Sequence, residues 1–344
     1  MNAACRAFAL NLPPSLARTL DPSFSRVYSP PHKAPSQQSK YKEVVMSFRR
    51  ALWALAVAMC LAAPVAVRAQ GDYLDVFIVK VKPEKHADFL ALARKYADAN
   101  RRFNGDRWIA MQAQYGEGGV YQFTSTRKDY ADTDKAGEAF MLAANKAFGK
   151  EAAQKMNQDF DSCLVWSRSE LRHRRWDLSR KAPQDAEAYA KLIGESRLLR
   201  TTAVHIRPGH VPDFEALMKD VREAAQKNPD TQTVFVSQVV EGSKGATFYV
   251  STLRSSMAGF DHNPTLREIL GDEGLKKYQQ ISADAVEIAD STLYRITPDL
   301  SNPPDEVAQV AMDFWHPKPV IVAAAKPRTA MQPDAAKEPT KKPQ

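Results

Sequence analysis

Cysteine is scarce in this sequence, with three residues in 344. Cys5 and Cys60 lie before residue 70, in a part of the chain that we expect to be removed, so that Cys163 remains alone. A single thiol cannot form an intrachain disulfide, and the fold must therefore be stabilised by burial of apolar side chains. The remaining length, enough for about two domains, can supply such a core.

Motifs of several common enzyme classes are missing as well. The sequence has no HExxH pair, no GxSxG and no Cys/His cluster with zinc spacing. Two glycine-containing segments, residues 116–119 and 241–245, precede strand patterns rather than helices, which is typical of hairpin turns and not of phosphate-binding loops. These absences argue against metal-dependent hydrolysis and dinucleotide binding, and we predict no bound metal.

Positive charge is in excess overall but not in the middle of the chain. The formal net charge is +8, yet residues 70–317 hold 33 Lys and Arg against 36 Asp and Glu. A domain that binds nucleic acid carries its positive charge on the face that meets phosphate. We therefore do not expect nucleic acid as a partner. The hydrophobic share of 44% and charged share of 26% are those of an ordinary globular protein.

The longest apolar run, residues 51–63, is shorter than the roughly 20 residues of a membrane-spanning helix. It follows Arg49-Arg50 and precedes Pro64 and the small residue Ala69, which is the three-part pattern of a secretory signal peptide over residues 46–69. We expect cleavage near Ala69 and an exported protein, periplasmic or secreted, without stable membrane insertion.

Residues 1–45 precede this pattern and are rich in proline and serine. We interpret them as a wrongly assigned or disordered extension, with translation starting at Met46. The alternative is an uncleaved signal anchor with a cytoplasmic arm. A lipid anchor on Cys60 is not expected, because Met59 before it is too large for lipoprotein cleavage.

The rest of the chain contains one pattern twice. Residues 79–83 (VKVKP) match residues 204–208 (VHIRP) at an offset of 125, and Asp88-Phe89 then matches Asp213-Phe214. Later matches follow at offsets of 126 and 122, ending with the triplet Asp-Leu-Ser at residues 177–179 and 299–301. An offset that drifts so little over a hundred residues indicates an internal duplication.

Each copy predicts the same order of elements. β-branched and apolar residues predict strands, and helical spacing of apolar residues after Pro83 and Pro212 predicts helices. The first copy predicts strands over 73–81, 108–115, 120–126 and 164–175, with helices after Pro83 and near 135–147 and 150–161. The second predicts strands over 200–206, 233–240, 247–253 and 292–296, with helices over 212–226, 266–270 and 273–286. The order βαββαβ, twice, is that of ferredoxin-like units in an α+β protein.

Both copies open with a strand, Lys or Arg followed by Pro, and a helix, seen as Lys82-Pro83 with Phe89 and as Arg207-Pro208 with Phe214. This opening resembles that of the dimeric α/β-barrel superfamily. That superfamily includes antibiotic-biosynthesis-type monooxygenases, the NIPSNAP family and haem-handling relatives. The resemblance covers most of residues 72–300 and implies two facing sheets that enclose a barrel, here formed within one chain. It brings no catalytic residue, because no family-specific active-site motif matches.

The domain organisation follows from these patterns. We predict unit 1 over residues 70–180, a linker over 181–197, unit 2 over 198–301 and a C-terminal extension over 302–344. A short helix near 185–193 fits the linker. From about residue 317 onward, Pro, Lys and Ala dominate and large apolar residues are too few to pack, so we predict a disordered tail.

The first strands of the two copies suggest a site. We assign Val79, Val81, Val204 and Ile206 to the helix-covered face, so that the alternate residues point to the barrel interior. The predicted ligand-binding residues are Lys80, Lys82, His205 and Arg207, with Tyr121, Phe123 and Tyr249 as aromatic walls. Such a cavity favours an anionic, partly aromatic small molecule. The alternative is a charged face exposed to solvent.

Two further features leave alternatives open. His205 is the one histidine that we weigh as an axial haem ligand, although no cofactor is otherwise predicted.

The closing strand of the first copy carries Arg168, Arg172, Arg174 and Arg175, which the second copy lacks. One interpretation is that this strand lies at the edge of a sheet, where its charges protect it against aggregation. The alternative is that the charges contact an anion. We favour the first interpretation.

Three functions are consistent with the sequence. The first is an exported protein that binds a small ligand in the barrel interior. The second is an enzyme, either a cofactor-independent monooxygenase-like protein or a haem-associated one. The third is an envelope protein-interaction module that uses the tail. Whether the protein is an enzyme, and its oligomeric state, stay open.

Overall fold

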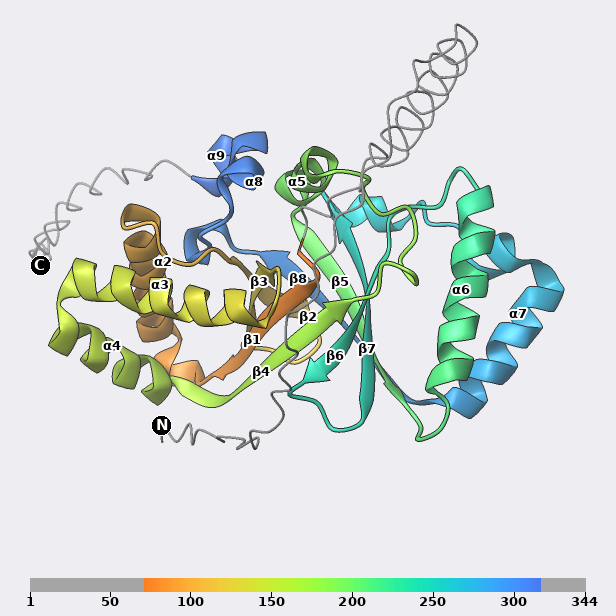
Figure 1. Ribbon diagram of the computed structural model, residues 1–344, viewed down its shortest axis with the longest axis horizontal. Coiled ribbons are helices and arrows are strands. Elements are labelled where there is room, and N and C mark those ends of the chain that lie inside the picture. The colour runs from red at the N-terminus through yellow and green to blue at the C-terminus, as the bar shows by residue number, and fades with distance from the viewer. Residues whose placement is uncertain (1–70, 317–344) are drawn as a thin grey trace, which may run out of the picture. The chain divides into compact units, whose positions relative to one another are not determined.

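A computed structural model describes residues 71–316 (Figure 1). The expected extension (1–45), signal peptide (46–69) and tail (from about 317) therefore lie outside the described residues. Within the described range, no helix combines the length and the hydropathy required to cross a bilayer.

The first unit folds in the predicted order. β1 (Tyr73–Val81) leads through a short 3₁₀ turn at Pro83–Lys85 into α2 (His86–Arg102). β2 (Ile109–Tyr115) and β3 (Val120–Arg127) form a hairpin, and α3 (Tyr130–Phe148), α4 (Lys150–Ser162) and β4 (Leu164–Arg174) follow. Gly149, with φ of 82°, joins the last two helices in a conformation that favours glycine.

The second unit repeats this order with shorter helical cover. Its elements are β5 (Leu198–Ile206), α6 (Val211–Lys227), β6 (Phe235–Glu241), β7 (Ala246–Arg254), α7 (Leu266–Ala285) and β8 (Val286–Ile296). Gly271, with φ of 70°, breaks α7 after one turn, at the position equivalent to Gly149. β8 begins six residues before the predicted strand at 292–296, because residues 286–291 also pair with β5.

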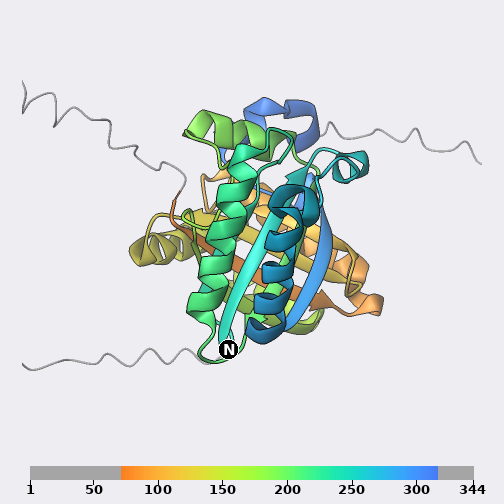
Figure 2. The same ribbon diagram turned by 90° about the vertical axis from the view of Figure 1, so that its right-hand side faces the viewer.

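The eight strands close into one barrel in the order β1-β3-β2-β8-β5-β7-β6-β4. The units join at two places, where β4 pairs with β6 and β2 pairs with β8, both antiparallel. Helices α2 to α4 cover the outside of the first unit, and α6 and α7 cover the outside of the second (Figures 1 and 2). The fold is therefore α+β, with two tandem ferredoxin-like units fused into a single barrel, as predicted.

Alternation along the strands separates an outer core from the barrel interior. Val79 and Val81 pack against α2 in one buried cluster, and Val204 and Ile206 pack against α6 in another. The assignment of these four residues to the helix-covered face is confirmed. The opposite faces of the strands point into the barrel, where Val76 belongs to a third cluster of buried apolar side chains.

The segment after each unit's last strand packs on the other unit. Leu178, which follows β4, lies in the core of the second unit, and Leu300, which follows β8, lies in that of the first. The next residues repeat one hydrogen bond. The Ser179 hydroxyl accepts from the Val236 amide at 2.9 Å, and the Ser301 hydroxyl accepts from the Ala110 amide at 2.9 Å. The duplication thus extends to individual contacts.

Three short helices lie together beside the barrel (Figure 1). The linker contains α5 (Ala186–Glu195), and the C-terminal extension forms α8 (Asp305–Val310) and α9 (Met312–Trp315). These helices share a buried cluster with Ile296 of β8, and the Trp315 indole donates to the Gly194 carbonyl at 3.1 Å. Residues 302–316 are therefore part of the fold.

Candidate binding site in the barrel interior

Strand β4 brings charge into the barrel. Its residues Arg168, Glu170, Arg172 and Arg174 alternate along one face, and Arg172 lies opposite Leu74 on the interior face of β1. β4 pairs with β1 on one side and β6 on the other. The interpretation of β4 as an edge strand is therefore wrong, because a closed barrel leaves it no edge.

A buried ion pair occupies the middle of this row. Arg172 Nε donates to Glu170 Oε2 at 2.8 Å, and both side chains are 4% exposed. The Tyr249 hydroxyl donates to Glu170 Oε1 at 3.1 Å, and the Arg172 guanidinium lies 3.4 Å from the centre of the Tyr249 ring. Burial raises the pKa of Tyr249, which keeps the phenol protonated as a donor. Glu170 thus provides a carboxylate partner for Arg172, and Arg168 Nε also lies 3.2 Å from Glu170 Oε1.

Arg174, two residues further, lacks such a partner. The residue is 6% exposed, and no carboxylate within residues 71–316 lies within ion-pair distance of its guanidinium. One terminal nitrogen donates to the Thr126 hydroxyl at 3.1 Å and to the Tyr189 hydroxyl at 2.5 Å, while Nε is buried without a hydrogen bond. The rings of Trp176 and Tyr189 lie 5.3 and 4.9 Å from its guanidinium carbon. Arg174 is therefore a buried cation held by neutral groups.

Arg172 and Arg174 both line a cavity of about 170 Å³ in the barrel. Its walls combine apolar side chains with hydroxyls from several strands, and α5 and α8 supply Tyr189, Ile193 and Val307 to its lining. We call it the barrel cavity. The polar side chains around it include Gln122, Thr124, Thr126, Thr201, Ser237 and Ser251. A buried cation, hydroxyl donors and apolar walls are the components of a site for a small anion.

Two of the predicted site residues face the interior but lie away from this cavity. β1 runs from Leu74, which lines the barrel cavity, to Lys80, and six residues of strand span ~20 Å. Lys80 there donates to the Gly118 carbonyl and pairs with Glu117 at 3.1 Å. His205 occupies the corresponding end of β5, with Nδ1 3.1 Å from Thr247 Oγ1. Neither residue lines the barrel cavity.

Lys82 and Arg207 follow the ends of their strands. The Lys82 ammonium donates to the Ser162 carbonyl at 2.8 Å, and Arg207 is exposed. Both are therefore outside the interior face of the barrel. That they bind a ligand stays a prediction, but they do not line the barrel cavity.

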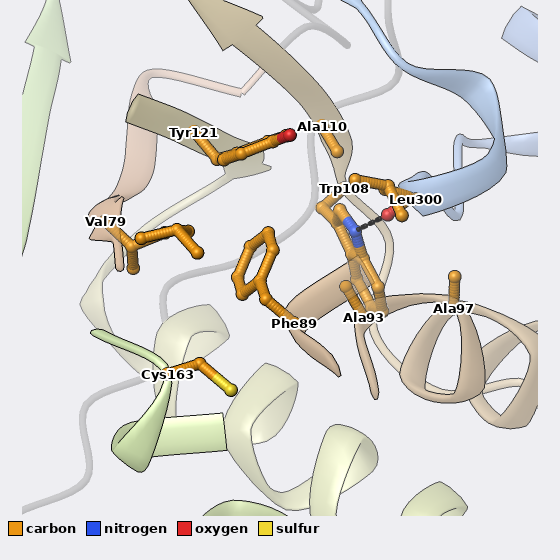
Figure 3. Close-up of a cluster of buried hydrophobic side chains, with 10 residues drawn as sticks. Val79, Phe89, Ala93, Ala97, Trp108, Ala110, Tyr121, Cys163 and Leu300 are labelled. Carbon is orange, nitrogen blue, oxygen red and sulfur yellow. Dashed lines mark hydrogen bonds between the residues drawn. The ribbon is translucent and has the colours of Figure 1, made fainter. Parts of the chain in front are cut away.

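The predicted aromatic walls divide between the two faces. Tyr249 faces the interior, as predicted. Tyr121 and Phe123 pack instead in the outer core of the first unit, where the Tyr121 ring centre lies 4.9 Å from that of Phe89 (Figure 3). The prediction that they line the interior is wrong, because Tyr121 pairs with Val79 and therefore shares its outward face.

The surroundings of His205 do not fit a haem group. His205 lines neither the barrel cavity nor a second cavity between α6, α7 and the outside of the barrel, and a haem needs a cavity beside its axial ligand. Across residues 71–316, no three His, Cys, Asp or Glu side chains are grouped to hold a metal ion.

Arg174 is visible in the sequence as one of a row of arginines, for which we favoured a structural role. The informative signal was their spacing, since Arg168, Arg172 and Arg174 are separated by even numbers of residues and must share a face. The contact with Tyr189 could not be inferred, because this residue comes from the linker, outside the repeat.

Comparisons with known proteins give only distant likeness. No family model matches the chain, and no curated protein matches it. Among solved structures, an anthrone oxidase-like protein is 12% identical, with a TM-score of 0.44 over 67% of this chain and 92% of that one. A candidate monooxygenase from Lactobacillus acidophilus is 9% identical, with a TM-score of 0.40 over 68% and 97%.

A chlorite dismutase from Candidatus Nitrospira defluvii is also similar. It is 9% identical, with a TM-score of 0.39 over 73% of this chain and 98% of that one. Likeness this low transfers no activity, substrate or cofactor to the present chain.

Proposed function

We propose that this protein binds a small anion with a ring-sized apolar body in the barrel cavity, with Arg174 as the charge partner. The observation that carries the proposal is the buried Arg174 guanidinium, which has no carboxylate partner among the described residues. Burying an unpaired charge is costly. A bound anion would offset that cost and would accept a hydrogen bond from Nε.

The size of the cavity limits the ligand. Its volume of about 170 Å³ is close to the ~150 Å³ of an engineered protein cavity that takes up benzene. A single aromatic ring with one carboxylate is therefore the largest simple anion that we expect to enter without movement of α5 or α8. The hydroxyls of Thr126 and Ser251 line the cavity and would form hydrogen bonds with polar groups of the ligand.

Benzoate titration by calorimetry tests the proposal. We expect saturable binding to the full chain, and Arg174→Met should weaken it at least tenfold, because the shape of the side chain is roughly kept while its charge is removed. Benzamide, which is neutral, should bind much more weakly than benzoate. Arg295→Met is the control, since it removes an equal charge at an exposed side chain that does not line the barrel cavity.

Three results would contradict the proposal. They are no benzoate binding at millimolar concentration, equal binding of benzoate and benzamide, or equal loss in the two arginine variants. Circular dichroism of each variant establishes that it is folded.

The other functions suggested by the sequence stay predictions. No contact within the described residues favours oxygenation, haem chemistry or a protein partner over ligand binding. Export with cleavage near Ala69 likewise rests on the sequence pattern of residues 46–69 alone.

A further inference from the structure

The second unit contains a larger cavity on the outside of the barrel. It has a volume of about 630 Å³ and lies between the outward faces of β5 and β7 and the helices α6 and α7, which cross this side of the barrel in Figure 2. We call it the outer cavity. Its lining includes Thr202, Val204, Phe214, Val221, Val250, Tyr278 and Ser282, together with Arg180, Arg200 and Arg222.

The equivalent space in the first unit is filled with aromatic rings. The strand registers make Phe77 equivalent to Thr202, and Phe123 equivalent to Val250. By the same registers, Trp108 corresponds to Val234, and the repeat offset places Tyr96 at Val221 and Phe160 at Ser282. These rings of the first unit pack in two clusters of its core that share Phe160, and Figure 3 shows Trp108 in one of them. Five large side chains are thus replaced by small ones around the outer cavity.

A missing helix enlarges the space. In the first unit, the 19 residues of α3 cover the sheet, and Phe140 stacks on Tyr96 at 5.3 Å. In the second unit only one turn, from Leu266 to Leu270, precedes the break at Gly271. Both differences between the units remove apolar volume from the same place, which destabilises a protein unless the space is used.

Charge changes at this place as well. In the first unit, Arg127 pairs with Asp106 at 2.7 Å and with Asp75 at 3.2 Å. Its equivalent in the second unit is Arg254, because Tyr73 pairs with Arg127 as Leu198 pairs with Arg254. The residues equivalent to the two carboxylates are Arg200, in place of Asp75, and Gln232, in place of Asp106. One acid is replaced by a base and the other by an amide.

Two more arginines occupy positions that are neutral in the first unit. Arg222 replaces the fully buried Ala97. Arg180 replaces Asn302, because Arg180 forms an isolated β-bridge with Val234 beside the outer cavity as Asn302 does with Trp108. The Nε atoms of Arg180 and Arg222 are buried without a hydrogen bond. Within residues 71–316, no carboxylate forms an ion pair with any of the three arginines that line the outer cavity. Burial and the neighbouring arginines lower the pKa of Arg254 beside them.

We propose that the outer cavity binds an amphipathic acid, with its apolar part between α6, α7 and the sheet and its carboxylate at Arg180, Arg200 and Arg222. The volume lies in the range of small-molecule sites, ~300–1,000 Å³. Because much of the lining is apolar, a purely polar anion such as phosphate is not the best ligand for this cavity. The three guanidinium groups without a carboxylate partner would repel a cation. A medium- to long-chain fatty acid has both required parts.

Calorimetric titration of the full chain with dodecanoate tests this proposal. We expect saturable binding, with dodecyltrimethylammonium as the charge-reversed control that does not bind. The double variant Thr202→Phe/Val250→Phe restores the rings of the first unit and should weaken dodecanoate binding at least tenfold by filling the cavity. Arg200→Asp restores the carboxylate of the first unit and should weaken binding to a similar degree by repelling the head group.

Benzoate and the barrel variant separate the two sites. Arg174→Met should leave dodecanoate binding unchanged, and Arg200→Asp should leave benzoate binding unchanged. Failure of the barrel site therefore does not affect this test. No dodecanoate binding below its critical micelle concentration would overturn the proposal, as would equal affinity in the folded double variant. If the double variant does not fold, Arg200→Asp alone decides.

Discussion

Two neighbouring arginines of β4 differ in how their charge is balanced. Arg172 is paired with Glu170 and stacked on Tyr249, so its burial is compensated within the protein. Arg174 is held by the hydroxyls of Thr126 and Tyr189, which are neutral. We therefore interpret Arg172 as a structural cation and Arg174 as a cation that is available to a ligand.

Tyr121 provides a test of the outer core. Burial raises its pKa from 10.0 to about 12, and its hydroxyl lies 2.7 Å from His86 Nε2. Because the phenol ionises at lower pH in the unfolded chain than in the folded one, the free energy of unfolding should fall as the pH rises from 10 to about 12.

The expected loss at Tyr121 is at most about 2–3 kcal/mol. Tyr121→Phe should remove its contribution and flatten the alkaline part of the curve, measured by urea unfolding at pH 9 and pH 11.5. Tyr96→Phe should act similarly, since burial also raises the pKa of Tyr96 to about 12. A pH dependence that is unchanged in both variants would contradict the assignment.

At the scale of elements, the duplication predicted most of the fold and little of the site. The repeat at offsets of 122 to 126 was sufficient to predict the order of strands and helices, because apolar periodicity is local. The start of β8 was missed, since the pairing of residues 286–291 with β5 is not local. Tyr121 was placed on the wrong face because alternation gives two faces without saying which one meets the helices.

The paired serines test whether the two units use equivalent contacts. Ser179→Ala and Ser301→Ala each leave a buried backbone amide, of Val236 and of Ala110 respectively, without its acceptor. Each substitution should lower the free energy of unfolding by about 1–3 kcal/mol. Denaturant unfolding measures the effect. Ser162→Ala, at an exposed serine, is the control and should change stability little. A loss confined to one of the two buried serines would contradict the equivalence.

At the scale of the whole molecule, the two units share one sheet and exchange their closing segments. β4 and β8 each pair with a strand of the other unit, and Leu178 and Leu300 each complete the other unit's core. Neither unit has a complete barrel or a complete core by itself. We therefore expect residues 71–316 to unfold as one cooperative system.

Phe89→Ala measures this coupling. Phe89 is fully buried in the first unit, and its truncation should cost about 3–5 kcal/mol. Hydrogen exchange followed by mass spectrometry should show reduced protection in β5 and β7 of the second unit as well as in β1 and β3. Loss of protection in the first unit alone would show that the units are independent.

The most direct test of the proposed function is a crystal structure of the full chain grown with saturating benzoate. The account predicts one benzoate in the barrel cavity, its ring against the apolar walls and its carboxylate within hydrogen-bond distance of the Arg174 guanidinium. A barrel cavity without benzoate under these conditions, or benzoate bound with its carboxylate turned away from Arg174, would contradict it.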